Sequence, residues 1–146
     1  MAAITFDKTG VELTALRLEG FTPQPPSERG ARQRVARWTY TAPGAVADGS
    51  QIEFLEFPAN ITIIGGAVTA STLANSGQMS IGWTVKSAPV DTNKADFKAA
   101  ATTVGAFLAS TWMKTTATTT VFGTLSVGDM AANDVLHGYV TYVDES

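Results

Sequence analysis

Apolar side chains occupy every second position of an eight-residue run, Gln78–Val85. Successive side chains of a β-strand point to opposite faces, so this alternation predicts a strand whose two faces meet different environments. A helix of the same length would need its apolar residues three or four positions apart. The chain is therefore expected to build its core from β-strands.

Other segments repeat or modify this pattern. Arg34–Thr41 alternates so that Trp38 lies on one face and Arg37 on the other, and Thr119–Val127 alternates in a similar way. Three further runs are apolar on both faces and rich in β-branched or aromatic residues, which favours strands inside a sandwich or at a subunit contact. These runs are Ile52–Phe57, Ile61–Thr72 and Val135–Val143.

Turn signals separate the predicted strands. They are Pro43-Gly44, Asp48-Gly49, Pro58-Ala59-Asn60, Asn75-Ser76-Gly77, Val127-Gly128-Asp129 and Ala132-Asn133-Asp134. Short strands with such spacing are typical of antiparallel sheets. One segment differs, because apolar residues recur at helical spacing between Lys94 and Leu108, where we expect a short helix or an irregular crossover. The sequence therefore predicts an all-β fold, an antiparallel β-sandwich of jelly-roll type rather than a barrel.

The N-terminal quarter of the chain has a different character. Thr22–Gly30 contains three prolines and no apolar periodicity, which indicates a linker. The preceding Val11–Leu18 fits either a short strand or an amphipathic helix. We therefore expect residues 1–33 to form an N-terminal arm with a Pro-rich linker, and residues 34–146 to form the β-sandwich domain.

Few residues in this chain are suited to catalysis. It has no cysteine and a single histidine, His137, which has no acid-base partner in a recognisable motif and is therefore expected to be structural. Glu53 and Glu56 lie three apart on a predicted strand, so we expect them on opposite faces as solvated edge charges. Gly65-Gly66 lacks a phosphate-binding context and indicates a bulge or a close strand approach. We predict no enzymatic activity, no catalytic residue, no metal site and no cofactor.

The arginines are unevenly distributed in a chain of net charge −3. All five lie in the first 37 residues, which carry six basic and four acidic side chains. Arginine recognises carboxylates and phosphates through paired hydrogen bonds. Aromatic side chains that could stack on bases lie on the face opposite Arg37, which argues against nucleic acid. Two interpretations of Arg29, Arg32, Arg34 and Arg37 are left open: docking on an acidic protein surface, which is the functional hypothesis, and an ordinary charged entrance to a strand.

Neither secretion nor membrane insertion is expected. The N-terminus lacks a basic start followed by an apolar run. The most apolar stretch, Ile61–Ala70, is about half the length that a membrane span needs. We therefore expect synthesis in the cytoplasm and no membrane partner.

Trp38 and Trp83 occupy inward positions of alternating strands, where core packing is expected. Trp112 is left unassigned. The uncharged run Thr115–Thr120 would be an aggregation hazard on an open edge, so we expect it to be paired or covered. Neighbouring subunits are expected to cover apolar faces that a single copy exposes.

Four segments together resemble a known group of proteins: Phe57–Val68, Met79–Trp83, Gly123–Gly128 and Gly138–Val143. Their strand and turn patterns, which span about residues 50–143, resemble the head decoration (cement) proteins of tailed bacteriophages and related small β-sandwich virion structural proteins. The resemblance implies binding to the outside of the assembled capsid, where the protein would bridge subunits of the major capsid protein.

The same resemblance implies a homo-oligomer, a trimer, formed through the sandwich. The arginines named above would then contact the capsid, and no cofactor would be needed. Two other functions are left open. One is a tail or fibre-base component of a phage virion. The other is a carbohydrate-binding module, which would need Trp112 or another aromatic residue exposed in a groove.

Overall fold

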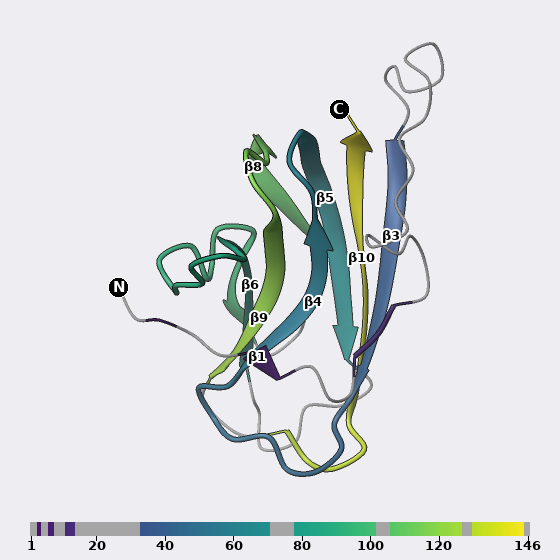
Figure 1. Ribbon diagram of the computed structural model, residues 1–146. Helices are drawn as coiled ribbons and strands as arrows, with labels where there is room; N and C mark the ends of the chain where they lie inside the picture. The colour runs from purple at the N-terminus through teal and green to yellow at the C-terminus, as the bar shows by residue number, and fades with distance from the viewer. Residues whose placement is uncertain are drawn as a thin grey trace.

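The computed structural model of the chain describes residues 3, 6–7, 11–13, 33–70, 78–101, 106–126 and 130–144. All regular secondary structure within these residues is β-strand, arranged in two five-stranded sheets that pack face to face (Figure 1). The strands are β1 (Phe6–Asp7), β2 (Val11–Leu13), β3 (Gln33–Thr41), β4 (Gln51–Phe57), β5 (Ile61–Ala70), β6 (Gln78–Val85), β7 (Lys98–Ala101), β8 (Ala106–Lys114), β9 (Thr119–Ser126) and β10 (Val135–Asp144).

Nested antiparallel pairs define the topology. β3 pairs with β10, β4 with β9, β5 with β8 and β6 with β7, as in one long hairpin folded across two sheets. Pairing of β10 with β5 and of β9 with β6 completes the sheet orders β1-β4-β9-β6-β7 and β2-β3-β10-β5-β8. Eight strands wound in this way form a jelly roll. The prediction of an all-β antiparallel sandwich of jelly-roll type is confirmed.

Two short strands from the N-terminal segment extend the sheets. β1 joins β4 in parallel, and β2 joins β3 in antiparallel orientation. The strand alternative for Val11–Leu18 is therefore found at Val11–Leu13. Thr22–Gly30 lies outside the described residues, and the division into an arm (residues 1–33) and a domain (residues 34–146) stays a prediction.

Six predicted strands occur with bounds that agree within two residues, namely β3, β4, β5, β6, β9 and β10. Three predicted turns contain a residue in the left-handed region, which Gly and Asn adopt most readily. These residues are Gly49 (φ 89°), Asn60 (φ 68°) and Asn133 (φ 70°). The glycine pair Gly65-Gly66 follows an irregularity in the β5–β8 register after Ile63, as its sequence predicted.

The sequence predicted either a short helix or an irregular crossover after Lys94, and the segment between β6 and β7 is an irregular crossover. Residues 86–97 form turns and bends, and the described part of Lys94–Leu108 contains no helix. Phe97 is buried, and its amide donates to the carbonyl of Ile81 at 3.0 Å. Pairing with β6 then directs the alanine-rich Lys98–Ala101 into a strand, so tertiary contacts override its helix propensity.

The two sheets meet at a core in which aromatic rings stack. Trp38 of β3 lies parallel to Phe54 of β4, with ring centroids 3.6 Å apart and an interplanar angle of 5°. Gly138 is paired with Trp38, and a Cβ atom at this glycine would overlap the indole ring. Trp83 is half-buried against the same core, and its Nε1 donates to Asp96 Oδ2 at 3.0 Å. Core packing of Trp38 and Trp83 is confirmed.

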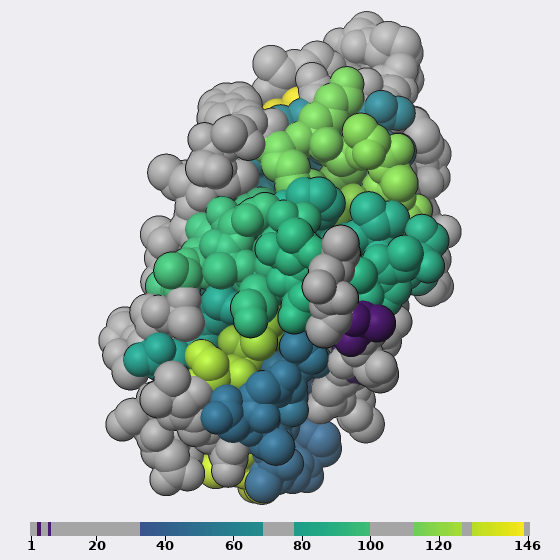
Figure 2. All heavy atoms as spheres, turned by 90° about the vertical axis from the view of Figure 1, so that its left-hand side faces the viewer, coloured from purple at the N-terminus to yellow at the C-terminus, as the bar shows by residue number. Residues whose placement is uncertain are grey.

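The outer face of the β4-β9-β6 sheet is covered. In β9, Thr119 to Leu125 are buried on both faces. Phe6 of β1 packs on Phe122, and the backbone of the crossover lies so close to Gly82 that a Cβ atom there would overlap Asn93 and Lys94. In Figure 2 the atoms of β6 and the crossover, teal to green, spread over the middle of this side of the molecule.

A bulge changes the orientation expected for two glutamates in β4. Glu53 pairs with Phe122 of β9, and after the bulge Glu56 pairs with Thr120. Both glutamates therefore face the same side, and the prediction of opposite faces is wrong because the extra residue shifts the alternation by one. Glu53 is buried rather than solvated, and Glu56 accepts a hydrogen bond from Lys86 Nζ at 3.0 Å.

Candidate functional site

The outer face of the second sheet is open to solvent. In β3 the side chains of Ala36, Trp38 and Tyr40 are buried, whereas the alternate residues are exposed or half-buried. Val35 of β3 is 45 % exposed and Tyr139 of β10 is 43 % exposed. Single exposed apolar residues are ordinary, but these two lie on adjacent strands of one face. We call this surface the open face, and its described members include Val35, Arg37, Thr39, Ala67, His137 and Tyr139.

Strand register brings the side chains of the open face together. Arg37 is paired with Tyr139, and Thr39 is paired with His137 one step along the same strands. Ala67 of β5 is the partner of Tyr139 on its other side. Paired residues have Cβ atoms about 4.5–5.5 Å apart, so their side chains are direct neighbours. A hydrogen bond joins Thr39 Oγ1 and His137 Nδ1 at 3.2 Å.

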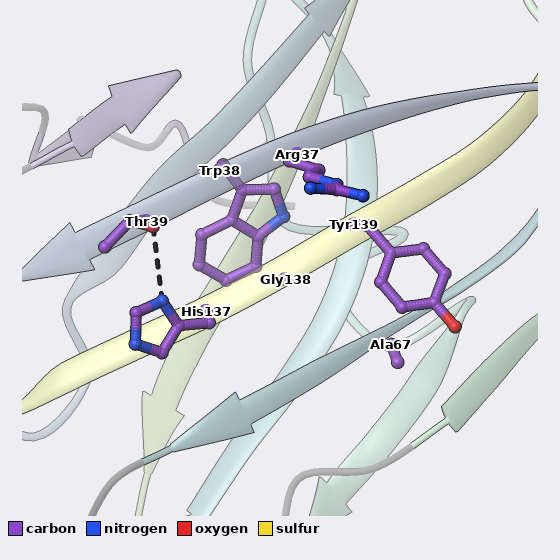
Figure 3. A pocket seen from close by; sticks show the side chains of 7 residues that line it. All are labelled: Arg37, Trp38, Thr39, Ala67, His137, Gly138 and Tyr139. Atoms are coloured by element: carbon purple, nitrogen blue, oxygen red, sulfur yellow. Dashed lines mark hydrogen bonds between the residues drawn. The ribbon is translucent and has the colours of Figure 1, made fainter. Parts of the chain in front are cut away.

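A hollow of about 350 Å³ lies at the centre of the open face (Figure 3). It forms because Ala67 and Gly138 are small, while Arg37, His137 and Tyr139 project around them. The described residues that line it are Arg37, Trp38, Thr39, Ala67, His137, Gly138 and Tyr139. The polar groups at its rim are hydrogen-bond donors or hydroxyls, and this composition suits binding of a polar partner group.

The predicted arginine cluster is divided by the structure. Arg29 and Arg32 lie outside the described residues. Arg34 is half-buried and pairs with the buried Tyr142, so it shares the inward-facing side of β3. Arg37, three positions later, is exposed on the open face. A surface that uses β3 can therefore present Arg37 but not Arg34, and contact through all four arginines stays a prediction.

Arg34 belongs to a buried polar group at one end of the sandwich. Burial raises the pKa of the Tyr142 hydroxyl, the Arg34 guanidinium lowers it, and the Asp144 carboxylate raises it further. Asp144 itself is 2 % exposed. These contacts give Arg34 a structural environment that differs from the solvent-exposed environment of Arg37.

His137 was interpreted from the sequence as a structural residue, and the open face places it at the rim of the hollow. The sequence signal for this placement lies in Val135–Val143. His137 and Tyr139 occupy odd positions and share one face of the strand, whereas Leu136 and Val140 occupy even positions and share the other. The prediction that this run is apolar on both faces does not distinguish the outward residues His137 and Tyr139 from the buried ones. Trp112 lies in β8, but its side chain is outside what the structure describes.

Groups of metal ligands and long apolar helices are both absent from the described ranges. No three histidine or acidic residues there lie close enough together to hold a metal ion. The same ranges contain no helix with the length and hydropathy needed to cross a membrane.

Comparison with solved structures identifies proteins of the same fold. No protein family matches the sequence, and no curated protein matches it. A chain from the capsid of Ralstonia phage GP4 matches with a TM-score of 0.64 and 18 % identity, over 86 % of this chain and 92 % of that one. A chain from the capsid asymmetric unit of cyanophage Pam1 matches with a TM-score of 0.54 and 11 % identity, over 89 % and 97 %. At these identities the likeness establishes a shared fold.

Proposed function

We propose that this chain is a structural protein of a phage virion, and specifically a decoration protein that binds the outside of the assembled head. The observation that carries the proposal is the match over most of the chain with chains from two phage capsids. Because each match also covers nearly all of the other chain, those capsid chains have about the same size as this one. A small jelly-roll chain is therefore a part of both capsids.

The uneven covering of the two sheets supports a docking role. One outer face is buried by the chain's own crossover and N-terminal segment, whereas the open face keeps Val35 and Tyr139 in solvent. Binding of the open face to a capsid subunit would remove this apolar area from water. The major capsid protein is the partner that we propose.

Such a protein would act through binding energy alone. A ligand that binds the assembled lattice and not free subunits stabilises the lattice by mass action. Many copies, each with a modest interface, add to a large effect, and linking copies in an oligomer raises their avidity. We propose a homotrimer, with a solution mass of about 46 kDa, three times the 15.3 kDa of the chain.

Sedimentation with purified phage particles tests the proposal. The protein is mixed with DNA-free heads, or with isolated tails, of the phage that encodes it, and its mass alone is measured by light scattering. We expect a trimer that pellets with heads and stays in the supernatant with tails. Pelleting with tails alone would overturn the decoration role in favour of a tail component.

A further inference from the structure

The hollow on the open face collects cationic and hydroxyl groups on a chain of net charge −3. Arg37 projects into solvent beside it and forms no ion pair with any residue that the structure describes. The described side chains that line the hollow include no carboxylate. A charged guanidinium at the edge of a hollow, with no carboxylate among the described lining residues, is complementary to an acidic group from another molecule.

The sheet geometry sets the size of the group that fits. Arg37 and Thr39 are successive outward residues of β3, and Tyr139 and His137 are their partners on β10. Such residues repeat about every 7 Å along a strand, and neighbouring strands lie about 5 Å apart. The four side chains therefore mark the corners of a small rectangle, and one carboxylate placed over it can accept hydrogen bonds from more than one corner.

We propose that the hollow binds the carboxylate of an aspartate or glutamate side chain from the protein on which the open face docks. Arg37 donates the paired hydrogen bonds of its guanidinium to the carboxylate, and His137 donates from a ring nitrogen. The ring of Tyr139 packs beside the aliphatic part of the acidic side chain. The identity of the partner rests on the proposed function, whereas the carboxylate site itself does not.

His137 gives this site a dependence on pH. The described side chains near it are Thr39 and Arg37 from β3, Tyr139 from β10 and Ala67 from β5. The backbone of Thr69 in β5 is in register with His137, and that of Glu12 in β2 with Thr39. A carboxylate bound beside the imidazole favours its protonated form. Protonation of the imidazole should therefore strengthen binding, and protonation of the incoming carboxyl group should weaken it.

The chain has one histidine, so the imidazole signals in a proton NMR spectrum belong to His137. We would titrate them with pH in the presence of about 100 mM N-acetylglutamate α-methylamide, which has one carboxylate, because single charge-assisted contacts are weak, and again with the neutral N-acetylglutamine α-methylamide. We expect N-acetylglutamate α-methylamide alone to raise the midpoint of this titration, because a bound carboxylate favours the protonated imidazole. The rise should disappear in Arg37→Gln and persist in Lys94→Gln, which removes an exposed charge in the crossover over the other sheet. An equal rise in both variants would overturn the carboxylate site.

Head binding by the same two variants tests which protein supplies the carboxylate that enters the hollow. If the wild-type protein binds heads, Arg37→Gln should raise the half-saturating concentration about tenfold or more, and Lys94→Gln should not. Equal binding by both variants would overturn the inference while the decoration role stands. A change in oligomer mass for Arg37→Gln, without a change in head binding, would assign the carboxylate to a second copy and overturn the capsid partner. Failure of the wild-type protein to bind heads would overturn the proposed function, and the NMR titration would still decide the carboxylate site.

Discussion

A single cross-strand pair, Trp38 of β3 and Gly138 of β10, decides how the indole packs between the two sheets. Trp38 fills the space between the sheets because its partner on β10 is a glycine. The indole then stacks on Phe54 from the other sheet. The sequence predicted that Trp38 points inward, but the need for glycine at position 138 depends on a cross-strand pair, which alternation alone does not identify.

Gly138→Ala should destabilise the fold, because the added methyl group overlaps the ring of Trp38. Overpacking of this kind costs about 1–3 kcal/mol. Gly44→Ala is the matched control, since a Cβ atom at Gly44 meets no atom within 4 Å. Chemical denaturation of both variants measures the difference, and equal stability of the two would contradict the packing that we describe.

Tyr142 provides a test at high pH. Burial raises the pKa of its hydroxyl above the ordinary value of 10.0, so the unfolded chain loses this proton at a lower pH than the folded protein does. The contribution of Tyr142 to stability is therefore present below about pH 10 and decreases as pH rises toward the folded pKa. Tyr142→Phe should remove this part of the alkaline loss of stability, measured by denaturant titration from pH 9 upward. Tyr139→Phe, at an exposed tyrosine, should leave it in place.

At the level of elements, the sequence predicted the strands that alternate clearly and missed those whose pairing depends on tertiary context. β6 was predicted with its observed bounds because Gln78–Val85 alternates throughout. β7 was missed because Lys98–Ala101 is mostly alanine, which favours a helix in isolation. The bulge in β4 was also missed, since the residues around Glu53 contain no glycine that would mark it.

The link between β8 and β9 is held to the β4–β5 turn by one threonine. Thr115 Oγ1 donates to the carbonyl of Pro58 at 2.7 Å and accepts from the amide of Ile61 at 3.0 Å. Its backbone also bonds Asn60 and Ile61. Thr115 is 1 % exposed, so this end of the threonine run is covered as predicted, whereas Thr116 in the following turn is exposed.

Thr115→Val keeps the shape of the side chain and removes both hydrogen bonds. We expect a loss of about 1–3 kcal/mol in unfolding free energy, because buried backbone groups lose their partner. Thr116→Val should change stability by less than about 0.5 kcal/mol. Thermal or chemical unfolding distinguishes the two, and an unchanged Thr115→Val would show that the hydroxyl does not hold the turn.

For the whole molecule, the main feature is the difference between its two outer surfaces. The chain covers one sheet with its own crossover and leaves the other open around Arg37, His137 and Tyr139. The sequence predicted the jelly roll and drew attention to the arginines. It could not show which arginine faces solvent beside a hollow, because that depends on the pairing of strands about 100 residues apart in the chain.

The most direct measurement is the binding isotherm of this protein on DNA-free heads for three forms: wild type, Val35→Glu and Ala95→Glu. Val35 is exposed on the open face, and Ala95 is exposed in the crossover over the other sheet. Each variant adds one negative charge at an exposed site, so neither should unfold the protein. We predict that Ala95→Glu binds like the wild type and that Val35→Glu raises the half-saturating concentration about tenfold or more. Equal binding by all three forms, or loss only in Ala95→Glu, would contradict docking through the open face.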